Sequence, residues 1–329
     1  DHYRRLYDIS PAAVAVDLHP GLKSRELGQG LAASLGVPLI EVQHHHAHAA
    51  ACLVEHGRPA SSPPVLALVL DGLGYGTDGT FWGCECLAVD YAGFRRLAHL
   101  RPVPMPGGAA AIRQPWRMAL AHLAVAHDLE KLFARHRRLP FFRAHDDSRT
   151  RTLLQAVRGG INAPLTTSLG RLFDAVAALV GLRETVTYEG QAAAELEAAL
   201  WRNRHGLAPP MCYRFDVDDA GIDPVPLWPQ ILADLEHGCG TGEIAYRFHA
   251  GLAEALLELA ERQAIRHAGL VERTVVLSGG VLQNAYLLRA LRAKFARRGW
   301  RVLCHERLPP NDGGLSVGQS AIASASIAG

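Results

Sequence analysis

Short, continuously apolar segments that alternate with helical patterns run through much of the chain. The clearest is Val65–Leu70, which has the length and composition of a strand buried on both faces. Residues 274–277 and 301–303 repeat this pattern near the end of the chain, and residues 282–298 between them have helical periodicity. Strands that alternate with helices in this way predict an α/β fold.

Other segments of the chain predict the remaining elements. Ser24 is placed to cap a helix of about ten residues that ends near Gly36. Residues 71–79 are rich in glycine and lie between two apolar segments, which predicts the turn of a β-hairpin. The pattern is helical from Arg113 to about Leu207, and a further long helix is expected over residues 242–268.

Composition and charge exclude several classes of protein. The chain has 329 residues, of which 49% are hydrophobic, enough for a sizeable core. Its net charge of +2 argues against a nucleic-acid surface, and no apolar segment approaches the roughly 20 residues that span a bilayer. The six cysteines show no C-x-x-C spacing, which is typical of reduced thiols. We therefore expect a cytoplasmic protein that binds neither nucleic acid nor membrane.

The first residues of the chain suggest that it is a fragment. The sequence begins with Asp1 rather than Met, and residues 1–7 look like the end of a helix. We expect an amino-terminal part to be missing.

The most informative motif is a cluster of histidines. His44, His45, His46 and His48 stand between an apolar strand and an alanine-rich helix. If they open that helix, His44 and His48 project from one face, as two ligands of one metal ion must. His45 and His48 could do the same, and a solvated helix start is the alternative without a ligand. Two histidines do not complete a coordination shell, so a distant third ligand is needed, preferably a carboxylate.

Two glycine-rich segments are candidates for phosphate binding. In Ser278–Asn284, glycines between a strand and a helix would let a ligand approach backbone N–H groups at the helix start. A tight turn without a ligand explains this segment equally well. Asp71 opens the glycine-rich hairpin, which could face a phosphate or a metal ion or have no ligand. It lacks the ligand spacing and closing glutamate of an EF-hand.

Three acidic positions also have two interpretations each. Asp312 could cap the last helix, or it could be the missing third metal ligand, because strand ends and helix starts meet at one cleft in such sheets. Asp174 lies on a helix, where aspartate is usually solvated, and Glu189-Gly190 resembles a helix start. No G-x-S-x-G or H-E-x-x-H motif is present, which argues against a serine hydrolase or a zinc metalloprotease.

Taken together, these segments resemble the carboxy-terminal carbamoyl-transfer domain of the hydrogenase-maturation carbamoyltransferases (HypF-type proteins). The resemblance covers nearly the whole chain and includes Asp17-Leu18-His19-Pro20, Val42–His48, Asp71–Gly79, Trp82-Gly83, Pro106-Gly107-Gly108, Gln114-Pro115-Trp116-Arg117, Tyr188-Glu189-Gly190, Ser278–Val281 and Asp312–Ser316. More distant relatives are the tRNA threonylcarbamoyl transferases and the antibiotic O-carbamoyltransferases.

The resemblance implies a two-lobed actin-like ATPase fold (ASKHA, threonylcarbamoyltransferase-like) with nucleotide in the cleft. Residues 1–110 would form the first lobe, with the histidine pair and the Asp-Gly hairpin. Residues 111–240 would form a helical insertion, and residues 241–329 the second lobe, with the Gly-Gly turn and the final aspartate. The family domain normally starts with an earlier strand pair, so we expect the first lobe to be incomplete.

The resemblance also implies roles for individual residues. His44, His48 and Asp312 match the metal ligands of the family, and Asp71 matches a catalytic carboxylate near the metal and the phosphates. The positions expected to contact nucleotide or substrate are Gly72, Gly74, Asp174, Gly190, Gly279, Gly280 and Asn284.

The implied reaction moves a carbamoyl group from carbamoyl-adenylate to the terminal cysteine of a HypE-type partner, on the route to the cyanide ligand of nickel–iron hydrogenases. The expected cofactors are ATP or carbamoyl-adenylate and one divalent ion (Mg, Fe or Zn). The acylphosphatase, zinc-finger and YrdC-like domains of longer relatives are absent, so a carbamoyl phosphate-derived substrate would have to be supplied already activated. The alternatives are a small-molecule O-carbamoyltransferase and a non-catalytic docking or metal-carrying module.

Overall fold

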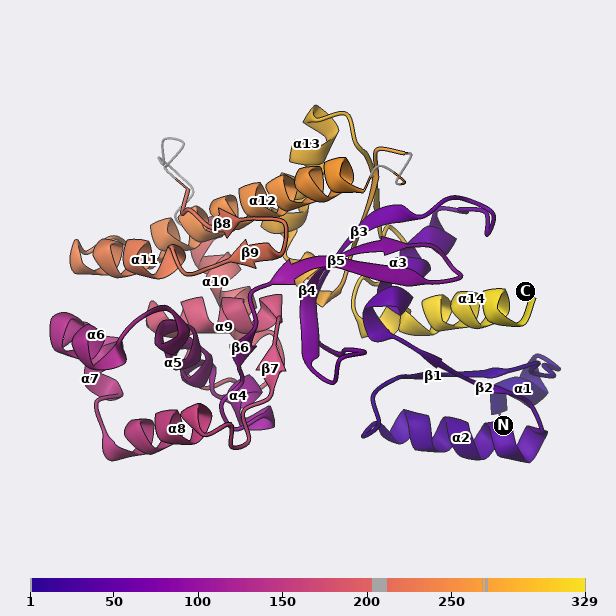
Figure 1. Cartoon of the computed structure of the whole chain (residues 1–329), viewed down its shortest axis with the longest axis horizontal. Coiled ribbons are helices and arrows are strands. Elements are labelled where there is room, and N and C mark those ends of the chain that lie inside the picture. The colour runs from indigo at the N-terminus through magenta and orange to yellow at the C-terminus, as the bar shows by residue number, and fades with distance from the viewer. Residues whose placement is uncertain (1, 203–211, 268, 270–271, 329) are drawn as a thin grey trace.

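A mixed β-sheet forms the centre of the protein and carries helices on both faces (Figure 1). The structure, a computed structural model, describes residues 2–202, 212–267, 269 and 272–328. The strands are β1 (Val14–Asp17), β2 (Leu39–Val42), β3 (Val65–Tyr75), β4 (Phe81–Val89), β5 (Phe94–Leu100), β6 (Val103–Pro104), β7 (Leu165–Thr166), β8 (Asp216–Val217), β9 (Gly221–Asp223), β10 (Thr274–Ser278) and β11 (Arg301–Cys304).

Helices make up most of the remaining described residues. They are α1 (His2–Leu6), α2 (Lys23–Leu35), α3 (His44–Glu55), α4 (Ala109–Arg113), α5 (Pro115–Ala126), α6 (Leu129–His136), α7 (Pro140–Ala144), α8 (Ser148–Arg158), α9 (Leu169–Leu179), α10 (Gln191–Arg202), α11 (Leu227–Glu236), α12 (Thr241–Arg266), α13 (Ala285–Arg297) and α14 (Leu315–Ala328), with the 3₁₀ turns η1 (Gly280–Gln283) and η2 (Asp312–Gly314). None of the described helices is both long and apolar enough to cross a membrane.

Strand β3 lies in the interior of the main sheet, whose order is β11-β10-β3-β4-β5-β9-β8. It pairs with β10 in parallel and with β4 in the antiparallel sense. Leu66, Leu68 and Leu70 belong to a hydrophobic core that includes residues of α5 and α9. Val65, Ala67 and Val69 belong to a second core that includes residues of α3. Because successive side chains of a strand point to opposite faces, this alternation buries the segment on both sides. The prediction of a doubly buried strand is confirmed.

The hairpin differs from its prediction. The expected turn over residues 71–79 is shorter, because β3 continues through Asp71 to Tyr75, and the chain reverses where the Gly76 N–H donates to the Thr80 carbonyl. The register with β4 shifts between Leu70 and Gly74. Asp71 therefore lies on a strand beside an irregularity, and such irregularities re-aim side chains next to functional sites.

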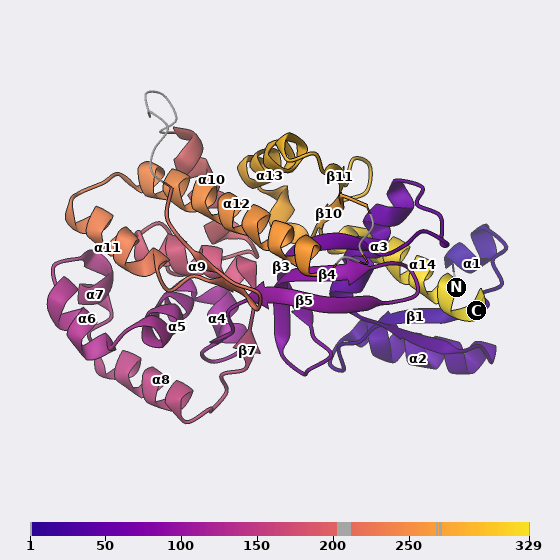
Figure 2. The ribbon, with the colours of Figure 1, turned by 45° about the horizontal axis from the view of Figure 1, so that its top comes forward.

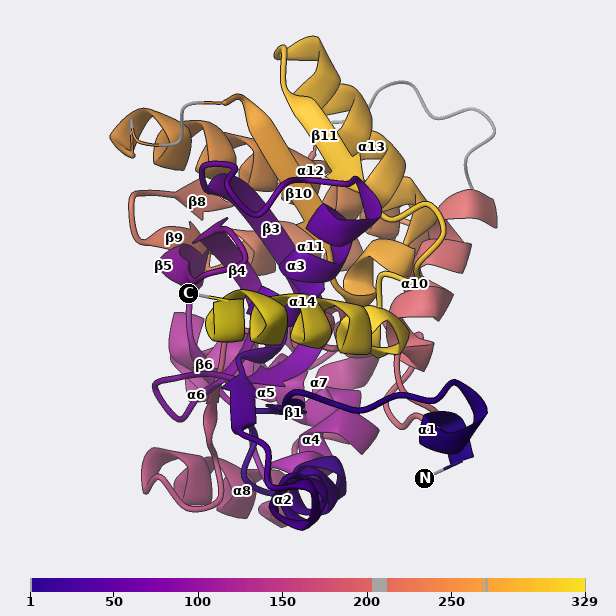
Figure 3. The same cartoon turned by 90° about the vertical axis from the view of Figure 1, so that its right-hand side faces the viewer.

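The amino-terminal and carboxy-terminal elements pack against each other (Figures 1 and 3). Helix α14 contacts α3, β1 and β2. The predicted cap at Ser24 is wrong: α2 starts one residue earlier, and its N-cap Leu22 makes no side-chain cap bond. Gly36 ends α2 in the left-handed conformation, as expected.

Helices α5, α6, α7 and α8 lie at the opposite end of the protein from β1 and β2 (Figures 1 and 2). Helices α5 and α9 pack on each other, and α9 also contacts β3. The short strands β8 and β9 extend the main sheet beside β5. This arrangement places the start of α9 next to Asp71 and Gly72 in the second half of β3.

Candidate functional site

The histidines open helix α3, as the spacing required. Gln43 is the N-cap, and its side chain accepts a hydrogen bond from the His46 N–H. The rings of His44 and His48 lie 4.9 Å apart between centroids on one face of the helix. His45 points elsewhere, because its Nδ1 faces Gln43 and its ring packs near Trp82. The structure therefore pairs His44 with His48 and leaves His45 out.

Two aspartates complete this cluster of four residues. Nε2 of His44 lies 3.3 Å from Asp71 Oδ2 and 3.6 Å from Asp312 Oδ1. Nε2 of His48 lies 3.7 Å from Asp71 Oδ2 and 3.6 Å from Asp312 Oδ1. One ligand atom from each of the four residues lies within 4.8 Å of all the others. Residues from α3, β3 and η2 thus converge on one point.

These distances fit a single cation. Ligand atoms about 2.1 Å from a tetrahedral metal ion stand roughly 3.4 Å apart, close to the separations of the cluster. Nε2 of His48 is buried and has no hydrogen-bond partner among the described residues. A buried polar atom without a partner is costly, and a cation would supply one. Two imidazoles and a carboxylate suit zinc, iron and other divalent ions.

Asp312 is not the cap of the last helix. Asn311 is the N-cap of the 3₁₀ turn η2 that precedes α14 and accepts the Gly313 N–H, which leaves the Asp312 carboxylate to face the imidazoles. The nearby imidazoles of His44 and His48 lower the pKa of Asp312 far below its ordinary value. The carboxylate is therefore ionised at neutral pH, as a metal ligand must be.

Asp17 orients His44, a role that the sequence analysis missed. Nδ1–H of His44 donates to Asp17 Oδ2 at 2.8 Å, which turns Nε2 toward the cluster. Burial alone would lower the pKa of His44, but the nearby carboxylates of Asp17, Asp312 and Asp71 raise it well above the ordinary value. Carboxylates commonly orient metal-binding histidines in this way. The sequence signal was the carboxylate at the end of an apolar strand, in Asp17-Leu18-His19-Pro20.

Replacing Asp17 with asparagine should weaken divalent-cation binding roughly tenfold, because the remaining amide keeps the contact but not the charge that raises the basicity of His44. Calorimetric titration with Zn²⁺ measures this effect. Glu41→Gln is the matched control, since the exposed Glu41 lies on the adjacent strand β2 and, among the described residues, forms an ion pair with Arg25 rather than with the cluster. Equal affinity in Asp17→Asn and the parent protein would contradict an orienting role.

Asp71 joins the cluster to a neighbouring loop. Its Oδ1 accepts the Gly280 N–H at 2.9 Å, while Oδ2 faces the two imidazoles. Burial acts to raise its pKa, but the nearby imidazoles of His44 and His48 lower that pKa well below the ordinary value. Asp71 is therefore a buried carboxylate that links β3, α3 and η1.

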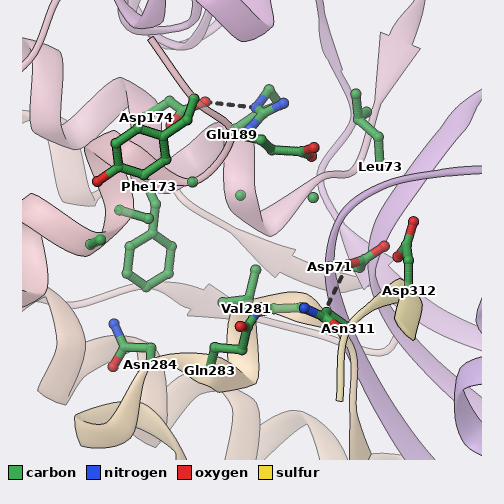
Figure 4. A pocket seen from close by; sticks show the side chains of 18 of the residues that line it. Asp71, Leu73, Phe173, Asp174, Glu189, Val281, Gln283, Asn284, Asn311 and Asp312 are labelled. Carbon is green, nitrogen blue, oxygen red and sulfur yellow. Dashed lines mark hydrogen bonds and ion pairs between the residues drawn. The ribbon is translucent and has the colours of Figure 1, made fainter. Parts of the chain in front are cut away.

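A cavity of about 630 Å³ opens beside this cluster (Figure 4). Asp71 and Asp312 lie at one end of it, and Asn284 and Phe173 lie further along. Its lining comes from β3, α9, residues 188–190, α10, η1, Asn284 and residues 311–313 at the start of η2. A volume of this size suits a nucleotide or another ligand of drug size.

Several of the predicted nucleotide contacts line this cavity. They are Gly72, Asp174, Gly190, Gly280 and Asn284. Asp174 is not solvated, as a lone helical aspartate usually is: it is buried and lies 2.7 Å from Arg171 Nε. Asn284 caps α13 by accepting the Leu287 N–H, and His249 Nε2 accepts from its amide. Arg171 and His249 had no distinguishing signal in the sequence.

Two predicted glycines lie outside the lining. Gly74 packs against the rings of His44 and His45, where an added Cβ would lie 2.6 Å and 2.5 Å from their atoms. Gly279 has a φ of 103°, and an added Cβ would lie 2.3 Å from the Leu70 carbonyl oxygen. Both glycines permit close approach of protein segments rather than contact with the cavity.

The fold and the cluster of imidazoles and carboxylates beside a cavity define a Kae1-like transferase domain. A family model described as "Carbamoyltransferase, Kae1-like Domain, second subdomain" matches residues 67–319, and one described as "HypF Kae1-like domain" matches residues 1–55. The chain belongs to the HypF carbamoyltransferase family.

Sequence similarity to known proteins covers nearly all of this chain. Carbamoyltransferase HypF of Rhodobacter capsulatus is 44% identical over 328 residues, which are 99% of this chain but 41% of that protein. A carbamoyltransferase HypF homolog of Cupriavidus necator is 40% identical over 94% of this chain and 77% of its own length. This chain therefore spans about two fifths of the longer relatives.

Solved structures support the fold. A crystal structure of full-length HypF in the phosphate- and nucleotide-bound form matches 99% of this chain and 49% of its own, with a TM-score of 0.85 and 37% identity. The HypF of T. kodakarensis matches 99% of this chain and 42% of its own, also with a TM-score of 0.85, at 30% identity. The prediction of an actin-like α/β fold is confirmed.

Proposed function

We propose that this chain transfers a carbamoyl group in the maturation of nickel–iron hydrogenases. The group would pass from carbamoyl-adenylate to the carboxy-terminal cysteine of a HypE-type partner, yielding a thiocarboxamide and AMP. The observation that carries the proposal is the convergence of His44, His48, Asp71 and Asp312 beside a nucleotide-sized cavity, in a chain of the HypF family.

Residues at and beside the two ends of the cavity would have different roles. At one end His44, His48 and Asp312 would hold a divalent ion, with Asp71 beside them. Such an ion supplies Lewis-acid polarisation of an oxygen and neutralises phosphate charge. At the other end Asp174 and Asn284 offer polar groups to the nucleoside part of the ligand. Gly280 leaves room for phosphate to approach the start of η1.

The nucleophile would come from the partner. Cys52, Cys84, Cys86 and Cys304 are buried, and no described cysteine or serine lines the cavity. Burial raises the pKa of the Cys84 thiol well above its ordinary value, so it is not activated as a thiolate. A thiol brought by another protein agrees with these facts.

Transfer to a defined acceptor tests the proposal. The protein, loaded with Mg²⁺ or Zn²⁺ and supplied with carbamoyl-adenylate, is incubated with a HypE-type protein and with its variant in which serine replaces the terminal cysteine. We expect carbamoylation of the first acceptor only, measured by intact-protein mass spectrometry. Carbamoylation of the serine variant or of small alcohols would favour O-carbamoyl transfer instead. Failure to bind ATP or carbamoyl-adenylate in calorimetry would favour a docking module.

A further inference from the structure

Glu55 at the end of the histidine helix binds the loop that leads to Asp312. Its Oε1 accepts hydrogen bonds from three consecutive backbone N–H groups, those of Glu306 at 3.0 Å, Leu308 at 3.2 Å, and Arg307 between them. Its Oε2 accepts from Nδ1 of His305 at 3.0 Å. The Glu55 side chain is 3% exposed. One buried carboxylate thus satisfies four donors of a segment about 250 positions away in the sequence.

The same contacts continue to the backbone of the metal-binding helix. Nε2 of His305 lies 2.8 Å from the Ser278 Oγ, and that oxygen lies 2.9 Å from the His48 carbonyl oxygen. We call Glu55, His305 and Ser278 the clamp. It joins α3, the end of β10 and the loop after β11, which leads to Asp312 in η2.

The clamp has the residue types of a serine hydrolase triad, but its geometry excludes that chemistry. Ser278 is fully buried and does not line the cavity, so no substrate reaches its oxygen. A nucleophile needs an accessible oxygen next to its base. The arrangement is therefore suited to holding segments in place.

The loop held by the clamp continues directly to the third metal ligand. The Gly279 N–H donates to the Pro310 carbonyl at 3.1 Å, and Pro309 packs so closely on Gly314 that an added Cβ would lie 2.6 Å from its oxygen. Residues between His305 and Asp312 therefore have contacts at both ends and little freedom between them. Asp312 itself is largely exposed, with 71% of its side-chain area accessible, so its position depends on this loop.

We propose that Glu55 is a positioning residue for the cation site, which sets the distance between the Asp312 carboxylate and the imidazoles of α3. The inference rests on the proposed metal-binding function and adds a residue that touches neither the ion nor the substrate. Glu55 belongs to the same helix as His44 and His48. Because that helix is rigid, the hydrogen bonds of Glu55 to the loop fix the position of the loop relative to those two ligands. Without the carboxylate, three backbone N–H groups lose their acceptor and the loop can move away from α3.

The charge of Glu55 is part of this function. Burial acts to raise its pKa, but the N–H groups of Arg307 and Glu306 and the ring of His305 outweigh it and lower the pKa to about 2. The carboxylate is therefore ionised throughout the neutral range, as an acceptor of four hydrogen bonds should be. Glutamine keeps the length of the side chain but presents an N–H₂ group or a weaker acceptor to at least one of the four donors.

The test measures cation affinity and local protection in Glu55→Gln. We expect Zn²⁺ to bind roughly tenfold more weakly than to the parent protein, the lower end of the effect of removing a group that orients a metal ligand. Hydrogen exchange of the amides of residues 306–308 should accelerate in the same variant. Glu272→Gln is the matched control, because Glu272 pairs with Arg58 just beyond α3 and, within the described part of the chain, makes no hydrogen bond or ion pair with residues 305–312.

Each outcome is decisive. Weaker Zn²⁺ binding in Glu55→Gln, with the control unchanged and the measurement made well below both melting temperatures, supports positioning. A lower melting temperature with unchanged Zn²⁺ affinity would show a purely structural role and overturn the inference. If Glu55→Gln does not fold, Ser278→Ala, which removes one hydroxyl of the clamp, is measured in the same way. Absence of Zn²⁺ binding in the parent protein would instead refute the proposed function.

Discussion

Replacing His48 with alanine is expected to abolish cation binding and carbamoyl transfer. Nε2 of His48 is one of the two imidazole nitrogens of the cluster. The side chain is only 2% exposed, so solvent has little access to supply a replacement ligand. Loss of a group that merely orients a ligand weakens metal binding by roughly 10- to 100-fold, so loss of a ligand should exceed that range. Calorimetry with Zn²⁺ and the transfer assay with the thiol acceptor measure both effects.

His46→Ala provides the matched control for this variant. His46 belongs to the same helix and is also buried, but its Nε2 faces the Asp90 carbonyl at 2.6 Å and not the cluster. Its replacement should cost stability and leave cation affinity nearly unchanged. Full transfer activity in His48→Ala would remove the metal ion from the mechanism.

The second large effect is expected in Gly318→Ala, which should destabilise the protein by about 3 kcal/mol, at or above the upper end of the range for overpacked cores. Helix α14 crosses close to α3 (Figure 3). At Gly318, an added Cβ would lie 1.9 Å from the Ala47 carbonyl oxygen and 2.9 Å from the Ala51 nitrogen. Backbone atoms cannot rotate away as a side chain can. Helix α14 must therefore shift from α3, and the cation site on α3 should weaken with it.

Urea denaturation measures the loss of stability, with Gly30→Ala as the control. Gly30 also lies inside a helix, but an added Cβ there meets nothing within 4 Å. Alanine should stabilise α2 by up to about 1 kcal/mol, because it restricts the unfolded chain. The two variants therefore shift the midpoint in opposite directions. A Gly318→Ala protein as stable as its parent would show that the two helices are not in close contact.

The small residues of α14 illustrate how a composition becomes interpretable in the structure. Residues 316–327 are rich in alanine, serine and glycine, and they form most of helix α14. The pattern did not indicate why small residues are needed there. The reason is the neighbouring backbone of α3, which lies far away in the sequence.

The sequence by itself determined the features that depend on local order. Six consecutive apolar residues predicted β3, and its burial on both faces followed from the lack of polar positions. The spacing of His44 and His48 predicted two imidazoles on one face, because a helix repeats every 3.6 residues. Where the pattern was ambiguous, as between His44 and His45, the helix start at Gln43 and the packing of Trp82 decided the orientation.

Only the tertiary structure decided which distant groups meet these histidines. Asp17, Asp71 and Asp312 come from three separate segments, and each has an ordinary local explanation as a residue at a strand end or a helix start. In the sequence, Glu55 is an ordinary polar residue at the end of a helix. Its role follows only from the contact with the loop 305–308 in the structure. Local periodicity carries information over a few residues, whereas these contacts depend on how β3, β10 and β11 align in one sheet and bring their ends together.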